Sequence, residues 1–132
     1  MFHPNGQPDY LRSGTGDELF GYVAECLVQF FSDNYDLIQD RTIHHLGFTF
    51  SYPCEQTAIN NGVLQRWTKG FNVKDVEGRD IVPLFEAALQ KVGMDIKVTA
   101  VINDTTGTLI ASNYADPTIK MGCIFGTGTF SR

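Results

Sequence analysis

Five polar residues in two parts of the sequence have the chemistry to bind a hydroxyl-rich ligand: Ser51, Thr68, Lys69, Asn103 and Asp104. Hydroxyl, amide and ammonium groups can hydrogen-bond to ligand hydroxyls. An aspartate carboxylate is ionised at neutral pH and can accept a proton from one of those hydroxyls. Asp104 also has a structural interpretation, because an aspartate that follows a strand most often caps the next helix.

A glycine-rich turn near the end of the sequence is a second candidate site. Gly126, Thr127 and Gly128 follow an apolar run, and the backbone amides of such a turn could face a phosphate group. Turns of this kind are also common where no ligand binds. The turn therefore indicates a phosphate site only in combination with other features.

Two apolar runs must position the first group of polar residues. Residues 46–52 alternate between aromatic or aliphatic and small polar side chains, which predicts a strand, and Pro53 ends it because proline has no N–H to donate. A second β-like run, residues 63–71, contains Trp67, which we expect in the core. Two such strands joined by a polar loop would bring the hydroxyl and ammonium groups of both segments to one edge of a hairpin.

The remaining elements alternate between helices and strands. In chain order, the sequence predicts a helix from Thr15 to about Phe31, a helix capped by Asp80 and ended by Gly93, a strand at 96–102, a helix at 109–115 and a strand at 121–125. The strand at 96–102 leads directly into Asn103 and Asp104. Open α/β sheets bind ligands at such strand–turn–helix passages.

Composition narrows the class of protein. The chain has 132 residues, of which 42% are hydrophobic and 19% charged, so it can form one globular domain. Its net charge of −5 offers no basic surface for nucleic acid or an anionic membrane. We expect no membrane span and no signal peptide, and the three cysteines have neither an even count nor a metal-binding spacing. These features favour a cytoplasmic protein with reduced thiols.

Four segments of the chain resemble the hexokinase family. Residues 46–53 (LGFTFSYP) and 67–71 (WTKGF) are similar to the sugar-binding signature of that family at the same interval. Residues 103–108 (NDTTGT) resemble the segment in which the family's catalytic aspartate lies, and Gly126–Gly128 resembles a loop that contacts ATP. Within that family, the chain most resembles the fungal hexokinases.

The resemblance implies a fold and a reaction. The fold is the actin-like ATPase (ribonuclease H-like) fold of sugar kinases, an α/β fold present here in part, with a mixed sheet and flanking helices. The reaction is ATP-dependent phosphorylation of glucose and related hexoses at the 6-hydroxyl, with ATP and Mg²⁺, as the first step of glycolysis. Such enzymes close a cleft between a small and a large domain around the sugar.

The resemblance also implies a role for each site residue. Asp104 corresponds to the general base, and Lys69 offsets charge near the transferred group. The residues expected to contact the sugar are Ser51, Pro53, Thr68, Lys69, Asn103 and Asp104. Those expected to contact ATP are Gly126, Thr127 and Gly128.

The chain also departs from the family pattern. Residues 1–117 resemble part of the small domain and residues 118–132 the start of the large domain, with no Asp-x-Gly-Gly-Thr phosphate motif. Phe130 stands where the family has an asparagine. We therefore expect an incomplete chain with exposed strand edges, low stability and little activity of its own.

Two other interpretations remain open on the sequence. The chain could be a catalytically inactive, hexokinase-like sugar-binding or regulatory protein, because binding and catalysis use the same residues. It could also be a truncation product without a function.

Overall fold

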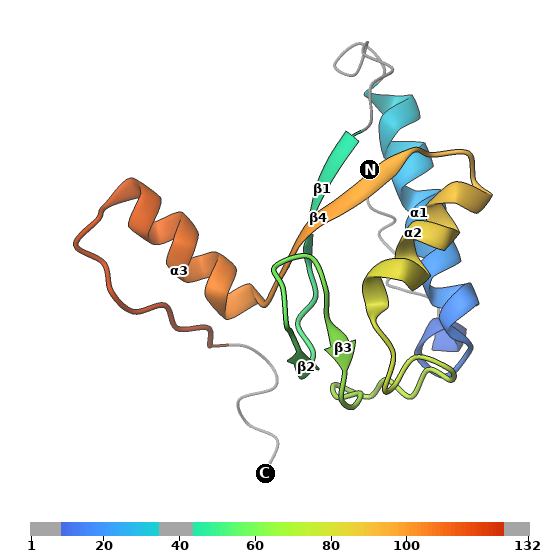
Figure 1. Cartoon of the computed structure of the whole chain (residues 1–132), viewed down its shortest axis with the longest axis horizontal. Coiled ribbons are helices and arrows are strands. Elements are labelled where there is room, and N and C mark those ends of the chain that lie inside the picture. Colours follow the sequence, from blue (N-terminus) through green and yellow to red (C-terminus); the bar gives the residue numbers. More distant parts are fainter. Residues whose placement is uncertain (1–8, 35–43, 126–132) are drawn as a thin grey trace.

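The computed structural model describes residues 9–34 and 44–125, which form helices and short strands in two small sheets. In chain order these are the 3-10 helix η1 (Asp9–Arg12), α1 (Gly16–Asp33), β1 (His44–Thr49), β2 (Cys54–Glu55), β3 (Val63–Leu64), α2 (Ile81–Lys91), β4 (Ile96–Ile102) and α3 (Asp104–Ala115). The α1 and α2 helices lie together on one side of the strands, whereas α3 extends away from them (Figure 1). The predicted α/β class is confirmed.

The central sheet consists of β1 and β4, which pair in parallel. Their register places His44 opposite Ile96 and Thr49 opposite Ile102, so both strands end at the same edge. The prediction that residues 46–52 pair with residues 63–71 in a hairpin is therefore wrong. The β-branched run of β4 buries an apolar face against the helices. This burial stabilises the parallel pairing more than the short sequence separation favours a hairpin.

The second sheet is a short antiparallel pair formed by β2 and β3. The predicted strand at 63–71 is limited to its first two residues. Lys69 and Gly70 have φ angles of +58° and +79°, which a strand cannot accommodate. The segment that resembles one strand in sequence is thus a strand followed by a turn. The strands do not join into one mixed sheet as expected but form a parallel and an antiparallel pair.

The free edge of β4 is partly covered by a loop. The side chain of Gln56 donates to the carbonyl of Val101 at 3.0 Å, and the N–H of Val101 donates to the carbonyl of Ile59 at 2.7 Å. Backbone groups at a sheet edge need partners when they are shielded from water. The loop between β2 and β3 therefore fixes the end of β4 that precedes Asn103.

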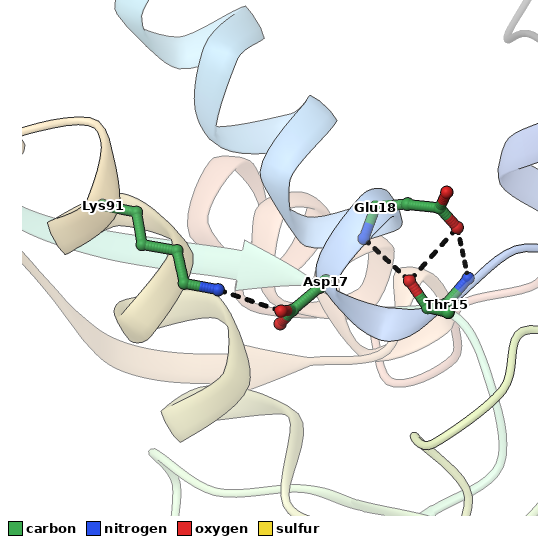
Figure 2. Close-up of polar contacts among 4 residues, drawn as sticks. All are labelled: Thr15, Asp17, Glu18 and Lys91. Atoms are coloured by element: carbon green, nitrogen blue, oxygen red, sulfur yellow. Dashed lines mark hydrogen bonds and ion pairs between the residues drawn. The ribbon is translucent and has the colours of Figure 1, made fainter.

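The α1 helix begins with the predicted capping box. The Thr15 hydroxyl accepts the N–H of Glu18 at 3.3 Å, and the Glu18 carboxylate accepts the Thr15 N–H at 2.7 Å (Figure 2). In the same first turn of α1, Asp17 pairs with Lys91 of α2 at 3.0 Å. Both side chains of this ion pair are largely exposed, so it orients the two helices more than it stabilises them.

The core lies between α1, α2 and the central sheet. Phe85 of α2 is 1% exposed, and its ring lies 4.9 Å from Phe48 and 5.9 Å from Phe20, measured between centroids. The predicted apolar face of α1 is confirmed at Leu19, but Phe30 near its end is 56% exposed. Phe48 of the alternating 46–52 segment therefore packs against α2.

Asp80 caps the start of α2, as predicted, and its carboxylate also accepts a second hydrogen bond. Its Oδ1 accepts the N–H of Val82 at 3.0 Å and the N–H of Gly62 at 3.0 Å, which ties the helix to the end of the β2–β3 loop. Replacing Asp80 by alanine leaves two partly buried N–H groups without this partner. We expect it to lower the free energy of unfolding by about 1–2 kcal/mol.

Urea denaturation of the variant measures this loss. Asp80→Asn is the matched control, because an asparagine oxygen can accept the same two hydrogen bonds and should retain most of the stability. An equal loss in both variants would show that the charge, and not the capping geometry, matters.

The segment after β4 differs most from the sequence expectation. The helix predicted at 109–115 begins five residues earlier, at Asp104, and residues 121–125 form no strand although a strand was predicted. Gly122 approaches Leu109 so closely that an added Cβ would lie 3.0 Å from the Leu109 Cβ. The segment therefore lies against α3, where no strand partner is available among the described residues. Large apolar side chains stay exposed here: Ile110, Tyr114, Met121, Ile124 and Phe125.

None of the helices in the described residues has the length and apolar character to cross a bilayer.

Candidate functional site

The candidate site forms where β1 and β4 end side by side. The N–H of Phe50 donates to the carbonyl of Ile102 at 2.9 Å, which continues the pairing one residue past β1. The next residue on each strand segment is then Ser51 and Asn103, followed by Asp104. The Ser51 Oγ accepts the backbone N–H of Asp104 at 3.3 Å. Two residues 53 positions apart in the sequence are thus joined directly, as expected at the carboxyl ends of parallel strands.

Lys69 reaches the same point from the turn after β3. Its ammonium group donates to the Ser51 carbonyl at 3.0 Å and lies 5.4 Å from the centroid of the Tyr52 ring. The turn is closed by the Phe71 N–H, which donates to the Thr68 carbonyl at 3.1 Å. Ser51, Lys69 and Asp104 are therefore brought together, although not by the predicted hairpin.

Asn103 and Asp104 begin α3. Asn103 is the capping residue, and its side-chain oxygen accepts the N–H of Thr105 at 3.0 Å. Asp104 is half-buried in the first turn, and its Oδ1 accepts the same N–H at 2.9 Å. The structural interpretation of Asp104 as the cap is thus wrong, because Asn103 has that role. Within residues 9–34 and 44–125, no donor reaches the other oxygen of Asp104, so this oxygen can accept from a ligand.

A cluster of aromatic rings lies next to the site and includes Tyr52, the neighbour of Ser51 in the sequence. Tyr52 lies 4.8 Å from Trp67 and 5.6 Å from Phe71, measured between ring centroids. Trp67 is 8% exposed, and its indole N–H donates to the Val73 carbonyl at 2.8 Å, so the prediction that it belongs to the core is confirmed. Burial raises the pKa of the Tyr52 phenol, against a smaller opposing effect of Arg12. The phenol is therefore neutral at physiological pH.

The other predicted residues lie around this point or outside the described residues. Thr68 is half-buried in the same turn as Lys69. Pro53 is exposed, and its carbonyl accepts the N–H of Gln65 at 2.8 Å. The predicted phosphate turn, Gly126–Gly128, lies outside the described residues.

Sequence reasoning missed the contact of Tyr52 with Lys69. The alternation of residues 46–52 places Tyr52 on the same face as Phe50, and this face predicts only a core position. An aromatic residue next to Ser51 was the available signal, but the turn that returns Lys69 to this ring could not be read from the sequence.

The described residues contain no group of three or more histidine, cysteine, aspartate or glutamate side chains arranged to hold a metal ion. Asp104 is the acidic side chain at the meeting of β1 and β4, and one carboxylate does not make a metal site. The donors found here suit a ligand with hydroxyl groups.

Cys54, in β2, is the half-buried cysteine of the described part. Burial raises the pKa of its thiol, with a smaller contribution in the same direction from the Asp80 carboxylate. Thiols react as thiolates, so we expect Cys54 to react with iodoacetamide at pH 8 more slowly than the exposed Cys26 and Cys123. Mass spectrometry of the modified peptides measures the three rates.

The same shift sets a pH dependence. The pKa of the Cys54 thiol is higher in the folded chain than in the unfolded chain, so its contribution to stability is present below the unfolded value. It is lost as the pH rises through the folded value. In urea the three alkylation rates should become similar. A Cys54 rate that is not the slowest of the three in the folded chain would contradict the shift.

Comparison with known proteins places this arrangement in one family. The family model described as hexokinase matches residues 5–114. The chain is 52% identical over 121 residues to hexokinase-2 of Candida albicans, and 52% identical over 121 residues to a hexokinase of Emericella nidulans. It is 44% identical over 123 residues to hexokinase-7 of Oryza sativa. Each match covers 92% of this chain and between 24% and 27% of the relative.

Solved structures agree with the sequence matches. The hexokinase of Schistosoma mansoni, solved as a complex with glucose, superposes with a TM-score of 0.79 at 41% identity. The match covers 86% of this chain and 25% of that one. A second crystal structure of a hexokinase superposes with a TM-score of 0.70 at 38% identity. The predicted sugar-kinase fold, present in part, is confirmed.

The chain thus spans about a quarter of the length of the relatives that it matches. The matched quarter contains the strand ends and the turn that bring Ser51, Lys69 and Asp104 together. The family model, the sequence identities and the superposed structures show that the chain belongs to the hexokinase family.

Proposed function

We propose that this chain forms the hexose-binding part of an ATP-dependent hexose kinase and supplies its general base, Asp104. One observation carries the proposal. Ser51 and Asp104, from the ends of two adjacent parallel strands, hydrogen-bond to each other, and Lys69 donates to the same serine. These contacts support a site in which the Ser51 hydroxyl, the Asp104 carboxylate and the Lys69 ammonium group bind one small polyol.

The proposed reaction transfers the terminal phosphoryl group of ATP to the 6-hydroxyl of a hexose. The hydroxyl oxygen forms a bond to the γ-phosphorus while the bond between that phosphorus and the bridging oxygen breaks, so ADP leaves. The hydroxyl proton passes to the free carboxylate oxygen of Asp104. The transition state is loose, and the protein acts mainly by positioning the sugar and by offsetting negative charge.

The other polar groups fix the sugar. The Ser51 hydroxyl accepts from the Asp104 N–H and keeps its own proton for a sugar hydroxyl. Asn103 uses its oxygen as the α3 cap, so its NH₂ group is the part that faces a ligand. Thr68 and Pro53 complete the proposed contacts from the neighbouring segments. The glucose complex of the Schistosoma mansoni hexokinase supports a hexose as the ligand.

ATP and Mg²⁺ are the proposed second substrate and its metal ion. Gly126, Thr127 and Gly128 are the proposed ATP contacts of this chain, with residues 1–117 as part of a small domain and residues 118–132 as the start of a large one. Among the described residues, no three histidine, cysteine, aspartate or glutamate side chains are grouped to hold the ion. We further propose a cytoplasmic location and a role in glycolysis.

Two measurements test this function. Calorimetric titration of the chain with D-glucose should give binding heat, whereas L-glucose, with the same polarity and the wrong handedness, should give none. To test turnover, the chain replaces the corresponding quarter of Candida albicans hexokinase-2, to which it is 52% identical. A coupled glucose-6-phosphate assay should then detect phosphorylation.

The outcomes separate two functions. A folded chimera that binds glucose without phosphorylating it would favour the alternative of a sugar-binding or regulatory hexokinase-like protein. Binding by neither the chain nor the chimera would contradict both.

A further inference from the structure

We infer that Tyr52 is a positioning residue that holds the Lys69 ammonium group at the sugar site through its aromatic ring. The inference builds on the proposed function, since it concerns the cation of that site. It rests on the juxtaposition of the Tyr52 ring, the Ser51 carbonyl and the Lys69 ammonium group.

Lys69 is an exposed lysine whose ammonium group contacts both the Ser51 carbonyl and the Tyr52 ring. A lysine side chain has four flexible carbons and loses considerable rotamer entropy when it is fixed. Here the Nζ atom donates to the Ser51 carbonyl at 3.0 Å. One exposed hydrogen bond stabilises a flexible side chain only modestly, so a second contact is needed to hold it.

The Tyr52 ring supplies that second contact. The Nζ atom lies 5.4 Å from the ring centroid, within the range at which an ammonium group is attracted to the electron-rich face. The ring itself cannot move freely, because it packs edge-on against Trp67 at 4.8 Å and against Phe71 at 5.6 Å. A fixed ring therefore orients a mobile cation.

The backbone at Lys69 brings its side chain back toward this ring. Lys69 has a φ of +58°, in the left-handed region that a non-glycine residue rarely adopts, and Gly70 follows with +79°. The turn is closed by the hydrogen bond from Phe71 to Thr68. The backbone turn, the Ser51 carbonyl and the Tyr52 ring thus converge on one ammonium position. Of these three, only the ring can be removed without changing a residue proposed to contact the sugar.

The aromatic cluster offers a matched control. Phe71 packs in the same cluster and contacts the same Tyr52 and Trp67 rings. Its own cation partner is Arg12, whose guanidinium carbon lies 5.8 Å from the ring centroid. Phe71→Leu should therefore loosen the cluster, but Tyr52 keeps its closer contacts with Trp67 at 4.8 Å and Phe50 at 4.9 Å, which hold the ring under Lys69.

The test measures the acylation rate of Lys69 in the folded chain by acetic anhydride labelling and mass spectrometry, relative to the exposed Lys74. We expect Tyr52→Leu to raise this ratio by about two- to fivefold, the size expected from one cation–π contact at a partly exposed site. Tyr52→Phe keeps the ring and should leave the ratio unchanged, as should Phe71→Leu. Thermal denaturation of each variant confirms that labelling is done well below its unfolding temperature.

The result decides the inference independently of turnover. An unchanged ratio in Tyr52→Leu, or an equal rise in Phe71→Leu, would overturn it. In a chain that binds glucose, Tyr52→Leu should also weaken glucose binding severalfold while Tyr52→Phe does not. Absence of glucose binding by the unsubstituted chain counts against the proposed function, whereas the acylation ratios still decide the role of Tyr52.

Discussion

Replacing Asp104 by asparagine is expected to lower kcat for glucose phosphorylation by about 10²- to 10⁴-fold, the range of general-base catalysis. The measurement uses the chimera with Candida albicans hexokinase-2 described above. Glucose affinity, measured by calorimetry, should change by no more than severalfold, because an asparagine oxygen can still accept a hydrogen bond from a sugar hydroxyl but does not take up its proton.

The structure explains why this variant should keep its fold. The Oδ1 atom of Asp104 accepts the Thr105 N–H, and asparagine has an oxygen that can do the same. The backbone N–H that donates to Ser51 is unchanged. A lower kcat would therefore reflect the loss of the proton acceptor and not a change at the start of α3.

Asp116→Asn is the matched control, since it makes the same chemical change at the other end of α3. Asp116 accepts hydrogen bonds from Thr118, which lower the pKa of its carboxyl, and it is exposed and distant in sequence from the proposed sugar contacts. Its kcat should remain near that of the parent chimera. If Asp104→Asn turns over at a similar rate, Asp104 is not the base.

Replacing Phe85 by alanine is expected to lower the free energy of unfolding by about 3–5 kcal/mol, the largest effect on stability that we predict. The side chain is 1% exposed and packs against rings from two other elements, Phe20 of α1 and Phe48 of β1. Its loss leaves a cavity where the helices meet the central sheet. Domains of this size are stable by only about 5–15 kcal/mol, so a large part of the chain's stability would be lost.

Urea denaturation followed by circular dichroism measures this change. Phe30→Ala removes the same atoms from α1, but that ring is 56% exposed, so the loss should be well below that of Phe85→Ala. A loss of less than about 1 kcal/mol for Phe85→Ala would show that the core between α2 and the sheet is not tightly packed.

The core around Phe85 and the strand ends that carry Asp104 share the same central sheet. This core packs β1 and β4 against the helices, and the common end of these strands carries Ser51 and Asp104, the proposed ligand contacts. The chain nevertheless spans about a quarter of its relatives, so it presents one side of a proposed site. The α3 helix lies on the far side of the strands from α1 and α2 (Figure 1), and its apolar side chains Ile110 and Tyr114 are exposed.

The sequence by itself determined the local elements that depend on short-range rules. The capping box at Thr15, the cap at Asp80 and the left-handed Gly93 after α2 were all predicted, because capping depends on side chains within a few residues. The strand at 96–102 followed from its β-branched run. The similarity of the 46–53 and 67–71 segments to hexokinases also identified the family correctly.

Only the tertiary structure decided how these elements pair. Residues 46–52 are close in sequence to residues 63–71, which favoured a hairpin, but β1 pairs in parallel with β4. Parallel pairing joins segments about 50 residues apart, and no local pattern encodes such a partner. The strand predicted at 121–125 failed for the same reason, since an apolar run becomes a strand only where a partner edge is available.

The geometry of the candidate site was decided in the same way. The residue types at positions 51, 69 and 104 indicated the chemistry, but only the structure joined them, through Ser51 to Asp104 and to Lys69. The left-handed turn at Lys69 and the ring of Tyr52 beneath its ammonium group depend on packing between segments. Side-chain chemistry is a property of single residues, whereas their convergence is a property of the packed fold.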